Sequence, residues 1–229
     1  VFAFLLRVTA ALVLDDSRVV LPDSREYLAI ADNVVAGKGL VLGESAQAKR
    51  PPGYPMFLVP FRALFGRTLL PIQIGQALLG GISCVLVFLL GLRLLDRPAA
   101  AFASIATAVY PLLVFTGPAI LIEALHTTLV LLEIWFLVRA ERHGAWGLAA
   151  GLAGGLGALV HAGHALFFLA VLLFVRRRFV LPYVGVFLLV IGVWTWRNSV
   201  VLGRFVPIST AGGYGLYEAL GPEANGGTV

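Results

Sequence analysis

The stretch Thr68–Leu92, TLLPIQIGQALLGGISCVLVFLLGL, holds 25 residues without a charged side chain and is bounded by Arg67 and Arg93. As an α-helix it would be about 37 Å long, enough to cross the ~30 Å hydrocarbon core of a bilayer. An uncharged apolar run of this length predicts a membrane span.

Comparable apolar runs follow it, over residues 98–122, 124–138 (interrupted by Glu133), 143–175 and 179–196. The composition agrees, because 59% of the residues are hydrophobic and only 13% are charged. A soluble domain averages about 45–50% apolar and about 25% charged residues. We therefore expect an all-α polytopic membrane protein, and the composition excludes a soluble globular domain, a disordered tail and a collagen-like fibre.

The charges also exclude some partners and sites. The net charge is +5, but the basic residues lie between the apolar runs rather than in one patch, which argues against nucleic acid as a partner. A single cysteine excludes a disulfide framework and a cysteine-based metal centre.

Three basic clusters set the expected orientation: Arg93 with Arg97, Arg139 with Arg142, and Arg176–Arg178. The positive-inside rule places them in the cytoplasm. Residues 15–67, 118–123 and 161–164 then lie on the outer side. Residues 145–175 would form a hairpin that turns at 161–164, and a single re-entrant or tilted helix is the alternative.

This orientation divides the chain into four parts. Residues 1–14 form a first span, which at 14 residues is too short to cross and is expected to be truncated. Residues 15–67 form a first outer loop, and residues 68–196 form the transmembrane bundle. Residues 197–229 begin a C-terminal outer loop, at which the fragment ends.

Within the first outer loop, residues 24–36 predict an amphipathic helix on the membrane surface, with Tyr27, Ile30, Ala31 and Val34 on one face. Asp23 with Glu26 three residues later resembles a capping box, which favours a helix cap at Asp23. A catalytic carboxylate is the alternative role of Asp23.

Two further charged residues lie at the same boundary. Arg50 precedes Pro51 and Pro52, and a guanidinium in so stiff a frame suits a phosphate oxygen, with a snorkelling interfacial cation as the alternative. Glu123 lies three residues before His126 on one helix face, a pair that suits acid–base work or a metal ion. A boundary carboxylate without a role is the alternative for Glu123.

Glu133 lies ten residues beyond Glu123, or roughly 15 Å deeper. An ionisable group near the middle of the bilayer indicates a proton or ion path, or a buried structural partner. His161 and His164 are read as polar turn residues. Gly147, Gly151 and Gly155 recur every four residues, which is typical of close helix packing in membranes.

Asp23, Arg50, Glu123 and the His161–His164 turn come from distant parts of the chain and are all expected on one side of the membrane. Carboxylates and a fixed cation at the outer face favour chemistry on a lipid-linked phosphate over transport through the midplane.

The chain resembles the GT-C class of polytopic glycosyltransferases, which includes protein O-mannosyltransferases and the aminoarabinose transferase of lipid A. The matching stretches keep the family's order and cover nearly the whole chain. They are Asp23–Leu40 (DSREYLAIADNVVAGKGL), Arg50–Pro55 (RPPGYP), Gln76–Gly80 (QALLG), Tyr110–Pro111, Glu123, Trp194–Asn198 (WTWRN), Gly203–Thr210 (GRFVPIST), Gly212–Gly213 and Leu216–Tyr217.

The resemblance implies an α-helical GT-C bundle whose first outer loop carries surface helices, in a bacterial inner membrane with its site facing the periplasm. It implies Asp23 as catalytic base, Glu123 in the active site, and Arg50 with Lys49 on the donor phosphate. Tyr27, Tyr54, His126, His161 and His164 are expected to line the substrate. The donor would be a polyprenyl-phosphate sugar and the acceptor a lipid, glycan or protein hydroxyl, attacked with inversion. A divalent metal at Asp23 or Glu123 is left open.

The sequence departs from the family at two places. Many relatives have Thr-Arg-Pro where this chain has His161–His164, and Gly-Asn-Asn-Pro where this chain has residues 218–222. Relatives also continue through several more spans, so the resemblance is to their N-terminal part. Two other functions are alternatives: a transporter that uses Glu133 and His126, and a non-catalytic membrane scaffold.

Overall fold

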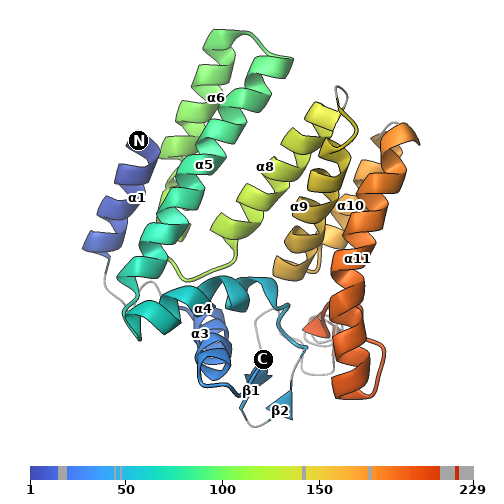
Figure 1. Cartoon of the computed structure of the whole chain (residues 1–229). Coiled ribbons are helices and arrows are strands. Elements are labelled where there is room, and N and C mark those ends of the chain that lie inside the picture. Colours follow the sequence, from blue (N-terminus) through green and yellow to red (C-terminus); the bar gives the residue numbers. More distant parts are fainter. Residues whose placement is uncertain are drawn as a thin grey trace.

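The computed structural model describes residues 1–14, 20–43, 45–46, 48–140, 143–174, 177–211 and 220–221. Tilted helices form a bundle, and two further helices lie across one end of it (Figure 1). The bundle helices are α1 (Phe2–Val13), α5 (Leu70–Leu94), α6 (Arg97–Val109), α7 (Pro111–Thr116), α8 (Glu123–Ala140), α9 (Trp146–Val160), α10 (His164–Phe174) and α11 (Arg177–Leu202). The end helices are α3 (Pro22–Val35) and α4 (Gly53–Phe65), and β1 (Val41–Leu42) pairs antiparallel with β2 (Ser45–Ala46) between them. The all-α prediction is confirmed.

Among the residues that the structure describes, two helices are long and apolar enough to cross a membrane. They are α5, with 25 residues, and the 24-residue stretch Phe179–Leu202 of α11. The bundle also exposes many large apolar side chains, including Phe102, Leu173 and Leu181, which are 75%, 81% and 82% exposed. A surface this rich in exposed apolar groups suits contact with lipid.

The two ends of the bundle differ in what they carry. The C-terminal ends of α5, α8 and α10 lie at the end opposite α3 and α4 (Figure 1). Arg93 and Arg139 are at that far end, whereas Arg142 and Arg176 lie outside the described residues. Asp23 of α3, Arg50 just before α4 and Glu123 at the start of α8 lie at the opposite end of the bundle from Arg93 and Arg139.

Three expected spans have different limits. Residues 98–122 do not form one helix, because α6 ends at Val109, where Tyr110 is extended ahead of Pro111 and the chain restarts as the short α7. Residues 161–163 separate α9 from α10, which is the hairpin interpretation. The predicted boundary at residue 196 falls inside α11, which continues to Leu202.

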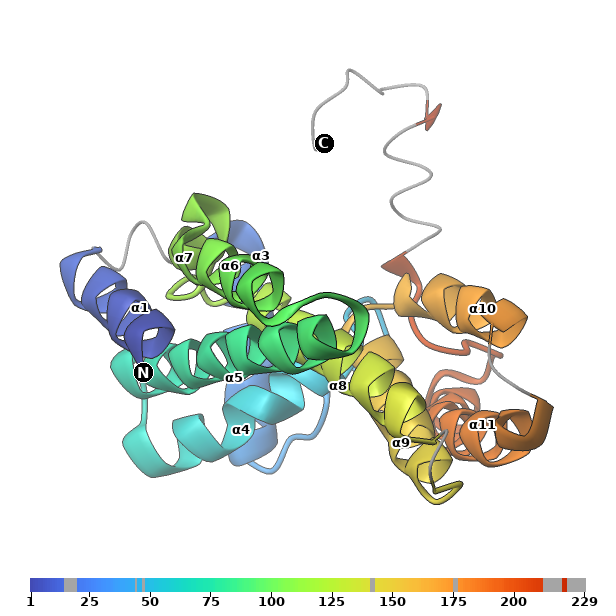
Figure 2. The same cartoon turned by 90° about the horizontal axis from the view of Figure 1, so that it is seen from above.

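The glycine pattern of α9 does form a packing seam, against α11. A Cβ atom at Gly151 would stand 2.3 Å from the Tyr183 carbonyl oxygen, and one at Gly155 would stand 2.8 Å from Cβ of Val190. Only glycine allows these backbones to approach so closely. Figure 2 shows α9 between α8 and α11 when the bundle is viewed from above.

The helix α3 packs on α4 through the predicted face. Tyr27, Ile30 and Ala31 are buried, and Val34 is half-buried. Arg62 of α4 binds Asp32 with two nitrogens, Nε at 2.6 Å and Nη2 at 2.8 Å. This bidentate pair fixes the two end helices to each other.

The predicted cap at Asp23 is wrong. The helix begins at Pro22, so Leu21 is the N-cap residue and Ser24 occupies the third helical position. The backbone N–H of Leu21 donates to Oγ of Ser24 at 3.0 Å. Proline is favoured at the first helical position, and that preference moves the helix start by two residues, from residue 24 to Pro22. Asp23 and Glu26 consequently direct their carboxylates elsewhere.

Candidate active site

Four charged side chains form an ion cluster at the end of the bundle. Arg50 donates to the carboxylates of both Glu26 and Asp23 in α3. Its Nε donates to Oε2 of Glu26 at 2.5 Å. Its Nη2 donates to Oδ1 of Asp23 at 2.5 Å, and its Nη1 donates to Oδ2 of Asp23 at 3.2 Å. Lys49 donates to the other oxygen of Glu26 at 2.9 Å. Asp23 and Glu26 lie one turn apart on one helix face, so a single guanidinium can span both.

The two carboxylates differ in how firmly they are held. Glu26 accepts from two cations and its side chain is 26% exposed, whereas the Asp23 side chain is 52% exposed. Burial raises the pKa of Glu26, but the hydrogen bonds from Lys49 and Arg50 outweigh it and hold that pKa below its usual value. Burial lowers the pKa of Arg50, but its bonds to Glu26 and Asp23 outweigh that effect and raise it, so Arg50 stays charged.

Two tyrosines connect the ion cluster to the bundle. The Arg50 guanidinium lies 5.2 Å from the ring centroid of Tyr27, and that ring meets Tyr54 edge-on at 5.0 Å. The Tyr54 hydroxyl donates to Oε1 of Gln76, and burial raises the Tyr54 pKa, so this donor keeps its proton. The predicted lining residues Tyr27 and Tyr54 therefore lie beneath Arg50.

Gln76 then fixes the turn that leads to Glu123. Its Nε2 donates to the carbonyl oxygens of Gly117 and Ala119 at 2.8 and 2.6 Å. Gln76 is fully buried, so each of these bonds replaces water that the groups have lost. The turn runs through residues 117–122 and ends at Glu123, the first residue of α8.

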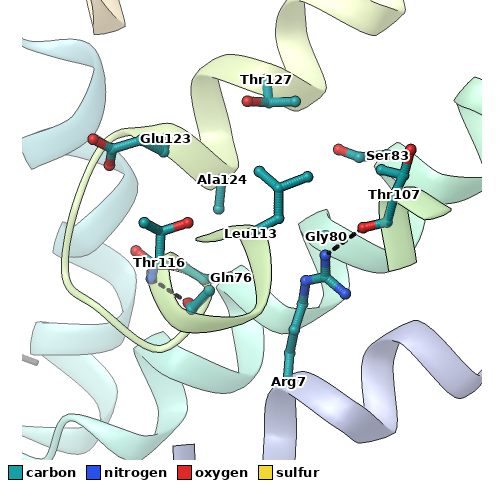
Figure 3. A pocket seen from close by; sticks show the side chains of 11 residues that line it. Arg7, Gln76, Gly80, Ser83, Thr107, Leu113, Thr116, Glu123, Ala124 and Thr127 are labelled. Atoms are coloured by element: carbon teal, nitrogen blue, oxygen red, sulfur yellow. Dashed lines mark hydrogen bonds between the residues drawn. The ribbon is translucent and has the colours of Figure 1, made fainter. Parts of the chain in front are cut away.

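Glu123 is exposed and lines a cleft between α5, α7 and α8 (Figure 3). Figure 3 places Glu123 and Arg7 on different sides of this cleft, with Gln76, Thr116 and Thr127 among the other lining residues. Arg7 is buried and donates to the carbonyl oxygens of Ala3 and Ala108. The predicted pairing of Glu123 with His126 is wrong, since His126 bonds to a histidine of another helix.

That bond belongs to a chain of polar groups inside the bundle. Nε2 of His126 lies 3.2 Å from Nδ1 of His164, and Nε2 of His164 lies 2.8 Å from Oε2 of Glu133. The Tyr183 hydroxyl donates to Oε1 of Glu133 at 2.5 Å. Glu133 is fully buried, and the His161 ring lies 5.1 Å from that of His126. His161 is an exposed turn residue as predicted, but His164 is buried and partnered on both nitrogens.

The chain after α11 returns to the ion cluster. Ser209 Oγ donates to the Lys49 carbonyl oxygen at 2.5 Å, and the Thr210 N–H donates to the Ala48 carbonyl oxygen at 2.9 Å. The Lys49–Arg50 segment is thus held on two sides. Its side chains bond to α3, and residues 209–210 bond to the backbone carbonyl oxygens of Ala48 and Lys49.

A divalent metal finds little support in the described residues. No three His, Cys, Asp or Glu side chains among them come close enough to hold an ion. Both oxygens of Asp23 accept from Arg50. The part of the chain that the structure describes therefore does not fit a metal at Asp23.

Sequence reasoning missed three members of the site. Glu26 was assigned to a cap, whereas its spacing from Asp23 was the signal that both carboxylates share a face. Gln76 and Tyr183 are polar groups within apolar runs, which is itself a signal of a buried partner. No local sequence pattern indicates which partner Gln76 or Tyr183 has.

Comparison with known proteins gives one family. The family described as dolichyl-phosphate-mannose-protein mannosyltransferase matches residues 49–196, well over half of the chain. The match includes Arg50, Glu123, Glu133 and the three site histidines, and it begins after Asp23 and Tyr27. No curated protein and no solved structure matches the chain.

Proposed function

The chain belongs to the dolichyl-phosphate-mannose-protein mannosyltransferase family and is a membrane glycosyltransferase, and we propose that it moves a sugar from a polyprenyl-phosphate donor to an acceptor hydroxyl at the α3–α4 end of the bundle. The acceptor is a protein, lipid or glycan hydroxyl. We further propose that this end faces outward from a bacterial inner membrane, because Arg93 and Arg139 lie at the other end.

The observation that carries the proposal is the position of Arg50 between Asp23 and Glu26. A donor of this type presents a phosphate at the membrane surface, and the surface helices α3 and α4 hold Arg50 at that level. A guanidinium binds two phosphate oxygens as readily as it binds two carboxylate oxygens. The donor phosphate would therefore compete with a carboxylate for Arg50.

Asp23 is the carboxylate that gives way in this exchange. It is about twice as exposed as Glu26, and Glu26 is held by Lys49 as well. When phosphate replaces Asp23 on the Nη1–Nη2 edge of Arg50, both oxygens of the Asp23 carboxylate are released and can accept a hydrogen bond from the acceptor hydroxyl. Donor binding would then switch on the base.

The reaction that follows is a single displacement. The acceptor oxygen bonds to the anomeric carbon from the face opposite the phosphate, and the bond from that carbon to the phosphate oxygen breaks, which inverts the centre. The acceptor proton passes to Asp23. The departing phosphate keeps the electron pair of the broken bond, and Arg50 with Lys49 stabilises its added charge.

A proton-coupled transporter is the second candidate, and one observation favours it. Glu133, His164 and His126 form a buried chain of ionisable groups, as proton-conducting proteins require. The family match favours the transferase. The two differ in which substitution abolishes function, Asp23→Asn for the transferase and Glu133→Gln for the transporter.

The test uses the purified protein in liposomes with radiolabelled polyprenyl-phosphate sugars and native membrane acceptors. We expect label transfer by the wild-type protein and its loss in Asp23→Asn and in Arg50→Ala. Arg25→Ala, which removes an exposed cation from α3, serves as the matched control and should retain transfer. Full transfer by Asp23→Asn would overturn the assignment of the base.

A further inference from the structure

The polar chain inside the bundle connects a fully buried carboxylate to an exposed turn. Glu133 and His164 are buried, His126 is half-buried, and His161 at the turn is exposed. The titratable groups that face one another along this chain are His126 and Glu133 of α8, His161 and His164 on either side of the turn, and Tyr183 of α11. The α9 helix contributes Gly154 and Gly157 instead.

Space for the chain is made by those two glycines. A Cβ atom at Gly154 would stand 2.6 Å from Oε1 of Glu133, and one at Gly157 would stand 3.0 Å from Nε2 of His164. The carboxylate and the imidazole therefore rest directly on the α9 backbone. Their positions are fixed by packing, so their hydrogen-bond directions are also fixed.

These directions allow only two proton arrangements for a neutral histidine pair. The Tyr183 hydroxyl donates to Oε1 of Glu133, which leaves Oε2 to face Nε2 of His164. If Glu133 is ionised, His164 carries its proton on Nε2 and donates it to Glu133. Nδ1 of His164 then accepts a hydrogen bond from Nε2–H of His126, and Nδ1 of His126 carries no proton. If Glu133 is protonated, the Glu133–His164 and His164–His126 hydrogen bonds both reverse, and Nδ1 of His126 carries a proton.

The two arrangements differ by one proton. A proton added at Nδ1 of His126 moves one proton from Nε2 of His126 to Nδ1 of His164, and one from Nε2 of His164 to Oε2 of Glu133. We call the arrangement with the added proton the loaded form and the one without it the empty form. The loaded form is neutral, whereas the empty form leaves a net negative charge in the bundle.

We propose that Glu133, His164 and His126 form a proton relay whose outer end, Nδ1 of His126, gives and takes one proton at the site. Glu133 and His164 are positioning residues that act through His126. The use of the relay rests on the proposed function: after the displacement, Nδ1–H of His126 gives its proton to the departed phosphate. The proton that Asp23 took from the acceptor then passes through water at the turn to Nδ1 of His126, so that no net proton is gained or lost.

The test is the tautomer of each histidine, measured by nitrogen-15 NMR on the full chain with labelled histidine in nanodiscs. The chain has four histidines, so His143→Gln and His161→Gln leave the ring nitrogens of two histidines to assign. We expect His126 and His164 to exchange tautomers together, with one shared midpoint, as the pH rises from about 5 to about 10. Both should move from Nδ1–H to Nε2–H.

Glu133→Gln provides the discriminating variant. Its amide N–H donates to Nε2 of His164 while its carbonyl oxygen accepts from Tyr183, so the variant reproduces the loaded form and cannot empty it. We expect Nδ1–H on both histidines at every pH. A shared exchange that persists in Glu133→Gln would overturn the relay, as would separate midpoints or no exchange in the wild-type protein.

The wild-type titration is decisive even where the variant fails to fold. The relay and the proposed function also fail separately. Loss of the shared exchange overturns the relay and leaves the Asp23 assignment standing. A shared exchange in a protein that transfers no sugar overturns the proposed function and leaves the relay in place, as a transporter would use it.

Discussion

Arg50 binds both oxygens of the Asp23 carboxylate with its two terminal nitrogens, at 2.5 and 3.2 Å. The candidate base and the candidate phosphate ligand therefore neutralise each other in the absence of a donor. Asp23 can act as a base only after something else takes its place on Arg50. In the proposed mechanism, this arrangement of one guanidinium on Asp23 would make donor binding and base activation one event.

Arg50→Lys is expected to separate charge from geometry. A lysine ammonium keeps the positive charge but cannot span Asp23, Glu26 and a phosphate, because it lacks the planar fork of arginine. We expect the donor KM to rise at least tenfold, a change of about 1.4 kcal/mol, with a smaller loss in kcat. Initial rates at varied donor concentration measure both constants, and an unchanged KM would contradict the role of the fork.

Glu26→Gln is expected to loosen the cluster in a pH-dependent way. The pKa of Glu26 is lowered in the folded protein, so its contribution to stability is present above the ordinary carboxyl pKa and is lost as the pH falls through the lowered value. At neutral pH the variant should be less stable by about 1 kcal/mol. Thermal unfolding should show this difference shrinking on acidification, whereas a constant difference would exclude the ionic contribution.

Gly151→Ala is expected to separate α9 from α11. The added methyl group would stand 2.3 Å from a backbone oxygen of Tyr183, and backbone cannot move aside as a side chain can. Overpacking of this kind costs about 1–3 kcal/mol. Gly192→Ala in α11 is the matched control, because a Cβ atom there meets no atom within 4 Å. Equal unfolding temperatures for the two variants would contradict the seam.

The features that the sequence predicts are those with a local period. The apolar runs, the buried face of α3 through Tyr27 and Ile30, and the glycine seam each repeat at helical spacing. The common end of Asp23, Arg50 and Glu123 follows from charge counts in short loops. The cap was mispredicted because Ser24 and Asp23 are both good acceptors, and Pro22 decides between them.

The contacts between distant segments could not be predicted. His126 and His164 are 38 residues apart and meet only because α9 turns back into α10 at residues 161–163. Glu133 shows by its depth that it needs a partner, but Tyr183 is one of several polar groups that could have reached it. Such pairings depend on helix packing, which here depends on where glycine lets two backbones approach.

Tyr183→Phe is expected to move the relay's titration without abolishing it. The phenol donates to Oε1 of Glu133, and this bond is stronger when the carboxylate is charged, so it stabilises the empty form. Removing it should raise the midpoint of the shared tautomer exchange by about one pH unit, which corresponds to about 1.4 kcal/mol. Gly185→Ala, in open space on the same helix, should leave the midpoint unchanged. A lower midpoint in Tyr183→Phe would mean that the phenol favours the protonated acid, and that the carboxylate does not hold the relay's negative charge.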